Sequence, residues 1–273
     1  MKKVSTITPC YKMGDYIEKF LEELQHQTLF PNFEVVLDHN DPEDWEVELV
    51  KKYIDKYPEG VIKHIITTPV SPIGTSMNTC IKNSKGEFLT IWNVDDLRTP
   101  NSLESQAKVL SENSDIDIVN SNYQIVNKFG TKSGRQIDHT IYPKSEYKRG
   151  MILGPFFMFR KNICERSGYF DEQLKSGADF DFAIRLAYNG NVKFSDGNAG
   201  FYLDEGKGAS TRQGSLQTVE KTVILLRYGI NDKIISENCQ PFISKAKEYD
   251  IENLTNFGDK INYKKFINLK NEK

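Results

Sequence analysis

Residues 91–96 read Ile91-Trp92-Asn93-Val94-Asp95-Asp96, an apolar run that ends in two adjacent carboxylates. Residues 97–100 then break the run with a polar, proline-containing turn, which is typical of a buried strand whose carboxyl end opens onto a surface. Ligands bind at that end of the strands in an open α/β sheet. Two neighbouring acids repel each other unless a cation compensates, so Asp95 and Asp96 are a candidate metal anchor. Taken alone, the pair fits turn or cap residues better.

The residues around this stretch alternate between strand and helix patterns. Strands are expected over 4–8, 33–37, 61–66 and 87–93, and helices from Asp15, from about Trp45 and over 74–83. Asp15 and Glu18 have the spacing of a capping box. This alternation predicts βαβ units in a mostly parallel sheet with helices on both faces. The loops at 9–13, 38–41 and 93–98 then share one edge and form a candidate crevice.

Composition restricts the class of protein. The chain has 273 residues with 36 basic and 38 acidic side chains, so its overall charge gives no support for a nucleic-acid or membrane partner. Its four cysteines are widely spaced, which argues against a zinc site or a disulfide framework and predicts buried, reduced thiols. No secretory start and no apolar run of membrane-spanning length is found. A cytoplasmic protein is therefore expected.

The common phosphate-binding signatures are missing. The chain has neither the GxGxxG of dinucleotide-binding folds nor the GxxxxGK[ST] of a P-loop. If a nucleotide binds at the crevice, something other than a glycine loop must neutralise its diphosphate. A divalent cation held by Asp95 and Asp96 would do so.

Several blocks, in the right order, resemble the family 2 glycosyltransferases of the GT-A fold. The resemblance covers roughly residues 3–212 and rests in the first half on Thr8-Pro9-Cys10-Tyr11, Glu34-Val35-Val36-Leu37-Asp38, Gly74-Thr75-Ser76-Met77-Asn78 and Asn93-Val94-Asp95-Asp96. It implies an α/β, Rossmann-like nucleotide-diphospho-sugar transferase fold, with a mostly parallel central sheet flanked by helices. Residues 1–214 would form this domain, and residues 215–273 a small helical C-terminal extension with helices over 216–228 and over 232–249, the second with a break at Pro241.

The second half adds a further block to this resemblance. Residues 154–160 and 168–172 look like the segment before the acceptor site, and residues 177–185 resemble the helix start that carries the catalytic base, which the match places at Asp179. The resemblance also implies donor contacts from Pro9, Tyr11, Asp38, Asn40, Asn78, Asn93, Asp95, Lys207 and Arg212. The implied metal ligands for Mn²⁺ or Mg²⁺ are Asp95, Asp96 and Asp204.

Each of these assignments has a simpler alternative. Asp179 could only complement the dipole of its helix, Tyr11 could be a loop aromatic, and Asp38 could be a turn residue. The loop with Lys207 and Arg212 could close over the donor phosphates or be merely solvated. Arg185 is expected to pair with an acid as a structural residue.

The implied activity is the metal-dependent transfer of a sugar, with inversion, from a nucleotide-sugar donor to a hydroxyl of a glycan or other acceptor. A UDP-linked donor is favoured. A cation at Asp95 and Asp96 would stabilise the leaving diphosphate, and a carboxylate on the opposite side would deprotonate the acceptor hydroxyl. Direct in-line attack would invert the anomeric configuration.

Four departures from the common family pattern keep other interpretations open. Asn93, Met77 and Ala178 stand where many members carry charged residues, and Asp204 or Glu205 replaces a histidine that often binds the metal. An inactive nucleotide-binding or sugar-binding module is therefore an alternative, as is a transferase that acts on a nucleic acid or protein. The lysine-rich residues 260–273 could contact a partner or membrane surface, or be a solvated end.

Overall fold

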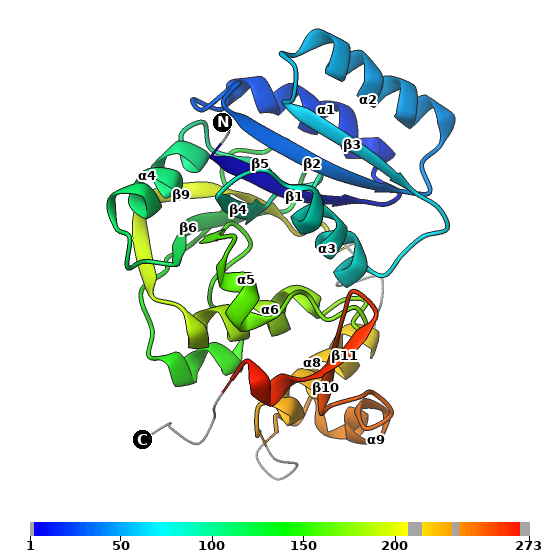
Figure 1. Ribbon diagram of the computed structural model, residues 1–273, viewed down its shortest axis with the longest axis vertical. Coiled ribbons are helices and arrows are strands. Elements are labelled where there is room, and N and C mark those ends of the chain that lie inside the picture. The colour runs from blue at the N-terminus through cyan, green and yellow to red at the C-terminus, as the bar shows by residue number, and fades with distance from the viewer. Residues whose placement is uncertain (1–2, 207–214, 231–234, 268–273) are drawn as a thin grey trace.

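The computed structural model describes residues 3–206, 215–230 and 235–267 (Figure 1). Its main sheet contains strands β1 (Val4–Cys10), β2 (Phe33–Asn40), β3 (Ile62–Thr67), β4 (Phe88–Ile91), β5 (Leu97–Arg98), β6 (Ile118–Val126), β7 (Arg135–Ile137), β8 (Met158–Arg160) and β9 (Val192–Leu203). The order is β3-β2-β1-β4-β8-β6-β9-β5, with β7 beside β6. Strands β3, β2, β1 and β4 are parallel, whereas β8, β5 and β7 run antiparallel to their neighbours. The expected α/β class with a mostly parallel sheet is confirmed.

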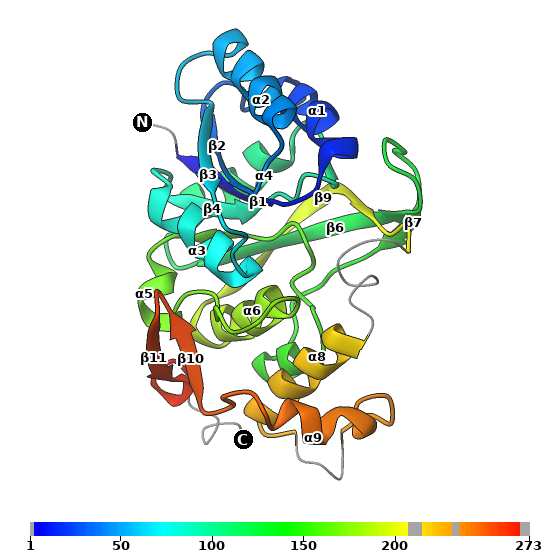
Figure 2. The same cartoon turned by 90° about the vertical axis from the view of Figure 1, so that its right-hand side faces the viewer.

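Helices cover both faces of the sheet. They are α1 (Gly14–Glu23), α2 (Asp44–Lys56), α3 (Ile73–Asn83), α4 (Ser102–Glu112), α5 (Ile163–Ser167) and α6 (Ala178–Asn189). Side chains alternate along β2, so that Val35 and Leu37 pack with α1, α2 and α4 while Val36 packs with α3 and α6. Figure 2 shows these two layers on opposite sides of the strands.

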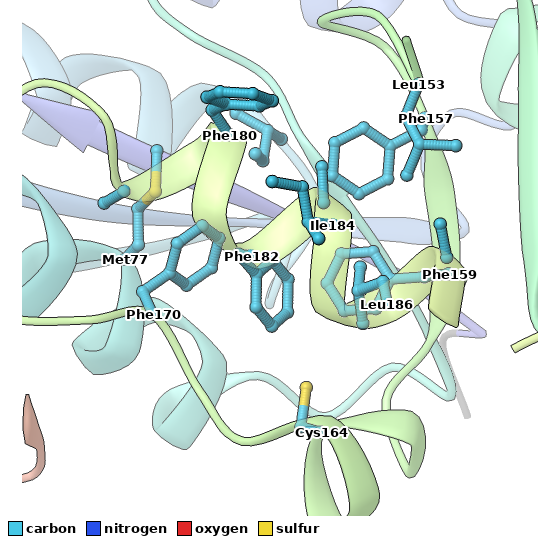
Figure 3. Close-up of a cluster of buried hydrophobic side chains, with 14 of the residues drawn as sticks. Met77, Leu153, Phe157, Phe159, Cys164, Phe170, Phe180, Phe182, Ile184 and Leu186 are labelled. Carbon is cyan, nitrogen blue, oxygen red and sulfur yellow. The ribbon is translucent and has the colours of Figure 1, made fainter. Parts of the chain in front are cut away.

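Helix α6 is buried on nearly every side. Phe180, Phe182, Ile184 and Leu186 contact a cluster that includes Phe157 from the segment before β8 (Figure 3). The helix also buries Asp181 and Arg185, which pair with each other, so it lies in the core although it is not wholly apolar. The position of its first turn is therefore set by packing from several directions.

The segment after residue 214 packs on the far side of α6. It holds α8 (Ser215–Arg227), α9 (Ile243–Ala246) and an antiparallel hairpin of β10 (Asn253–Asn256) and β11 (Asp259–Asn262). The extension is helical only in part, because residues 253–262 form this hairpin, which the sequence analysis did not predict. The expected helix over 232–249 was also too long: residues 231–234 lie outside the described part, and only short turns at 240–242 and 243–246 are helical. The boundary at 214 stays a prediction, since Val223 and Ile224 share the core cluster of α6.

Three local expectations were also wrong. Helix α1 begins at Gly14 with Met13 as its N-cap, so Asp15 lies in the first turn and no side-chain cap forms. Residues 38–40 continue β2, because each pairs with a residue of β3. Residues 97 and 98 form β5, which pairs with β9.

The remaining expectations concern the thiols and the membrane. All four cysteines are buried and free, as predicted. Among residues 3–206, 215–230 and 235–267, no helix is both long and apolar enough to cross a bilayer.

Candidate active site

The acidic pair lies in the turn directly after β4. Leu203 at the end of β9 donates its backbone N–H to Oδ1 of Asp96 at 3.0 Å, and Asn93 Nδ2 lies 3.2 Å from Oδ2. Trp92, buried on the other side of the turn, donates from Nε1 to the Asp96 carbonyl at 3.0 Å. Asp96 is 2% exposed. Its carboxylate is thus fixed by β9, while Asp95 is only half-buried.

The electrostatics of this turn favour a bound cation. Burial, followed by the negative charge of Asp95, raises the pKa of Asp96 well above its ordinary value. Burial also raises the pKa of Asp95, and Glu205 adds to the effect. No ion pair within the described residues includes Asp95 or Asp96. Carboxylates that form no ion pair fit a hard divalent cation such as Mg²⁺ or Mn²⁺.

The third metal ligand is less well defined. Asp204, the predicted one, is exposed, and its Oδ1 accepts a 3.4 Å hydrogen bond from the Gly206 N–H. Glu205 accepts hydrogen bonds from the Tyr16 hydroxyl at 3.1 Å and the Phe129 N–H at 3.2 Å. Across the described part of the chain, no three His, Cys, Asp or Glu side chains form a ready-made metal cluster. Asp204 and Glu205 both stay predictions as the third ligand, and of the two only Glu205 is seen to raise the pKa of Asp95.

Arg98 lies buried behind the acidic pair. Its guanidinium sits 5.6 Å from the ring of Trp92 and 5.1 Å from that of Phe156, and it donates to Thr90 Oγ1 at 2.6 Å. Burial lowers its pKa to about 9, against the opposing effect of Asp96. The positive charge beneath the turn thus partly offsets the acids without pairing with them. Sequence reasoning gave Arg98 no role, because a turn was expected there.

A second polar group lies at the end of β2. Asp38 is fully buried, and its carboxylate accepts hydrogen bonds from Thr67 Oγ1 at 2.6 Å, Ser76 Oγ at 2.5 Å and Asn40 Nδ2 at 3.0 Å. Asn40 Oδ1 in turn accepts from the backbone N–H of Ser71 at 3.0 Å. The contacts of Asp38 and Asn40 with a donor stay predictions. The sequence pattern did not reveal that the hydroxyls of Thr67, at the end of β3, and Ser76, on α3, bind the carboxylate at the end of β2.

The other predicted donor contacts divide into three groups. Pro9, Tyr11 and Asn93 lie at the same edge of the sheet as Asp95, and Tyr11 is 41% exposed, as a residue that contacts a base would be. Asn78 bonds the backbone N–H and C=O of Phe170 and donates to Glu172 Oε1, each at 2.9 Å, and its contact with a donor stays a prediction. That pairing ties α3 to the loop before α6. Lys207 and Arg212 lie outside the described residues.

Asp179, the predicted base, lies in the first turn of α6. The N–H of Phe180 donates to its Oδ1 at 2.8 Å. Burial raises its pKa, and Glu220 on α8 adds to the effect. A raised pKa brings a carboxylate closer to the range in which it serves as a general base. Arg185 pairs with Asp181 at 2.7 Å, as expected of a structural residue.

Solved structures place this architecture in a known class. Staphylococcus aureus TarS residues 1–349, in complex with UDP-GlcNAc, superimposes with a TM-score of 0.64 at 21% identity, over 90% of this chain and 73% of that one. A mannosyltransferase from Pyrobaculum calidifontis, in complex with GDP-Man and Mn²⁺, superimposes with a TM-score of 0.60 at 16% identity, over 89% and 69% of the two chains. The fold is that of the GT-A glycosyltransferases, which confirms the expected fold.

The sequence comparisons define the family. The family model for glycosyl transferase family 2 matches residues 5–168, so the chain belongs to that family, and the resemblance is confirmed. An uncharacterized glycosyltransferase of Rickettsia typhi is 26% identical over 212 residues, which are 70% of this chain and 60% of that protein. The chondroitin synthase of Pasteurella multocida is 21% identical over 270 residues, 97% of this chain and 27% of that protein. The chain therefore spans only part of these relatives.

Proposed function

We propose that the chain transfers a sugar, with inversion and with the help of Mn²⁺ or Mg²⁺, from a nucleotide-sugar donor to a hydroxyl of a glycan or glycoconjugate. A UDP-linked donor is favoured, since the TarS structure holds UDP-GlcNAc. The observation that carries the proposal is the acidic pair: Asp95 and Asp96 lie without a cationic partner in the described structure, at the ligand-binding edge of a family 2 fold.

Each side chain has one task in this proposal. Asp95 and Asp96, with Glu205 or Asp204, would hold the cation. The cation supplies Lewis-acid stabilisation of the charge that develops on the leaving diphosphate. Asp179 accepts the proton of the acceptor hydroxyl, which in general-base catalysis contributes about 10² to 10⁴ in rate. The hydroxyl oxygen bonds to the anomeric carbon from the side opposite the departing phosphate, so the configuration inverts.

One observation favours a different function. Met77 is 4% exposed and Ala178 is 1% exposed, and both belong to the core cluster of α6. These two positions thus offer no charge to a substrate. A nucleotide-binding module without turnover would bind UDP and transfer no sugar to any acceptor.

The test of the metal role is transfer from nucleotide sugars with and without EDTA. Asp96→Asn should abolish metal-dependent turnover, because it removes the buried charge while the amide oxygen can still accept from Leu203. Asp55→Asn, on the exposed side of α2, is the matched control. Metal-dependent turnover that survives Asp96→Asn would show that the acidic pair does not hold the cation.

The test of the base is Asp179→Asn. Transfer should be lost while UDP affinity, measured by calorimetry, is retained. A loss of UDP affinity instead would move Asp179 from the acceptor side to the donor side of the site.

A further inference from the structure

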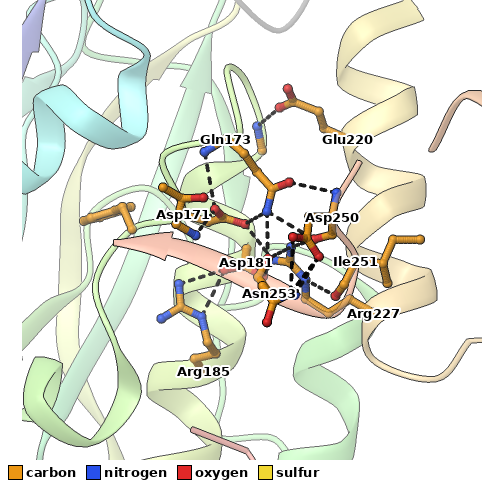
Figure 4. Close-up of polar contacts among 12 residues, drawn as sticks. Asp171, Gln173, Asp181, Arg185, Glu220, Arg227, Asp250, Ile251 and Asn253 are labelled. Carbon is orange, nitrogen blue, oxygen red and sulfur yellow. Dashed lines mark hydrogen bonds and ion pairs between the residues drawn. The ribbon is translucent and has the colours of Figure 1, made fainter. Parts of the chain in front are cut away.

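Helix α8 places two buried charged side chains against the beginning of α6 (Figure 4). Glu220 is fully buried and Arg227 is 1% exposed. Both come from the segment beyond residues 5–168, where the family model ends. Buried charges are costly unless they are paired and hydrogen-bonded, so their partners indicate what they hold in place.

Glu220 binds the backbone that leads into α6. Its Oε1 accepts from the N–H of Lys175 at 2.8 Å, and its Oε2 accepts from the N–H groups of Ser176 at 2.7 Å and Gly177 at 2.8 Å. Helix α6 begins at the next residue, Ala178. The carboxylate thus satisfies the amide of the N-cap residue Gly177 and those of the two residues before it, and its charge complements the helix dipole.

The close approach of α8 depends on Gly177. A Cβ atom at this position would lie 3.0 Å from Ile224 Cδ1 and 3.4 Å from Glu220 Cβ, both on α8. Even the smallest side chain would crowd the contact through which Glu220 reaches the three amides. The absence of a side chain at Gly177 therefore allows α8 to pack closely against the beginning of α6.

Arg227 holds the other side of the same turn. Its Nη1 lies 2.8 Å from Oδ1 of Asp181 and 2.9 Å from Oδ2 of Asp171. The hydroxyl of Tyr228 donates to the same Oδ1 of Asp181 at 2.9 Å, and Arg185 pairs with the second oxygen. Asp181 is two residues from Asp179. Helix α8 thus holds the backbone that ends two residues before Asp179 and the side chain two residues after it.

We infer that Glu220 and Arg227 are positioning residues for Asp179, and that α8 therefore belongs to the catalytic apparatus. The inference rests on the proposed role of Asp179 as base. Misplacement of a reacting group by about 1 Å can cost about 10²-fold in rate. Loss of the contacts that fix the chain on both sides of Asp179 should therefore lower kcat. Of the charged side chains in the described structure, Glu220 is the one whose charge acts on Asp179, and it favours the protonated form.

The decisive variant is Glu220→Gln. It preserves the size of the side chain, removes the charge and turns an amide N–H₂ toward backbone donors. We expect kcat to fall on the order of 10²-fold with UDP affinity unchanged. Loss of the negative charge should also lower the pKa of Asp179, so the acid limb of the kcat profile should move to lower pH. Lys221→Ala, the exposed neighbour on α8, is the control and should change neither quantity.

A purely structural role would give a different result. It would lower the Tm and the fraction of active protein but leave the acid limb of the surviving activity where it was, and that outcome overturns the inference. Wild-type kcat in folded Glu220→Gln also overturns it. Should this variant not fold, Glu220→Asp decides, since it keeps the charge but withdraws the carboxylate: a wild-type kcat refutes the inference, and a large fall with intact UDP binding supports it.

Failure of the inference can be told apart from failure of the proposed function. If Asp179→Asn is inactive and Glu220→Gln is normal, only the positioning role is wrong. If Asp179→Asn remains active, the assignment of the base is wrong, and the positioning role falls with it.

Discussion

Replacing Arg227 by methionine should destabilise the protein strongly. The guanidinium compensates two fully buried carboxylates: Asp171 at 2.9 Å and Asp181 at 2.8 Å. Asp181 would retain Arg185, whereas Asp171 would lose the ion pair that the described structure gives it. Removing one partner from a buried ion pair costs about 3–5 kcal/mol. At about 2–4 °C per kcal/mol for a domain of this size, the Tm should fall by roughly 6–20 °C.

Urea unfolding at neutral pH measures this free energy directly. Lys108→Met is the control, because Lys108 is 70% exposed and pairs with Glu112, which is 61% exposed, at 3.9 Å, so its loss should cost less than about 1 kcal/mol. The double variant Arg227→Met/Asp171→Asn should recover part of the loss, since it removes the uncompensated charge. A loss below about 1 kcal/mol in the single variant, with an unchanged m-value, would refute the reasoning.

The pH dependence of the same variant has a definite sign. Burial already raises the pKa of Asp171, and Arg227 opposes that rise. Without Arg227 the folded-state pKa should rise further, so the folded protein would bind a proton that the unfolded chain has released. Stability of the variant is then lost as pH rises through that pKa, and the deficit relative to wild type should narrow toward acidic pH.

Three further predictions concern the site. Because the pKa values of Asp95 and Asp96 are raised, protons should compete with the cation, and Mn²⁺ affinity measured by calorimetry should weaken as pH falls, from a higher pH than for an ordinary aspartate; constant affinity would contradict this. Because the pKa of Asp179 is raised, the acid limb of kcat should lie above the ordinary range of an aspartate, and a limb within that range would show that another group is the base. Asn78→Ala should cost roughly 1–3 kcal/mol in urea unfolding while UDP affinity is unchanged, since its partners are the backbone of Phe170 and the side chain of Glu172; weaker UDP binding would instead support the predicted donor contact.

Local patterns predicted the first half of the fold well. The strands near Val4, Phe33 and Phe88 alternate with amphipathic helices, and their parallel pairing follows from βαβ geometry. The same rule placed Pro9, Tyr11, Asn93 and the acidic pair at one edge. These predictions needed only the order of elements along the chain.

Long-range contacts account for the expectations that were wrong. Asp38 and Asn40 have the composition of a turn, yet pairing with β3 draws them into the sheet, and hydroxyls from distant segments satisfy them. Arg98 became a buried strand residue through pairing with β9. Glu220 lies in an ordinary amphipathic helix, and only the position of α8 beside Gly177 gives it three backbone partners.

Strand β9 has a consequence for how the length of this chain can vary. Its register against β6 shifts twice: between Ser195 and Asn198, where Asp196 and Gly197 are exposed and Gly197 has a φ of +88°, and again between Asn198 and Phe201. Beyond the second shift the strand pairs regularly from Phe201 to Leu203, whose amide holds Asp96. An insertion at 196–197 would lengthen only the first irregularity, whereas one between Phe201 and Leu203 would reverse which side chains face each side of the sheet and move the amide away from the acidic turn. Related chains should therefore differ in length at 196–197 and keep a constant spacing from Phe201 to Leu203.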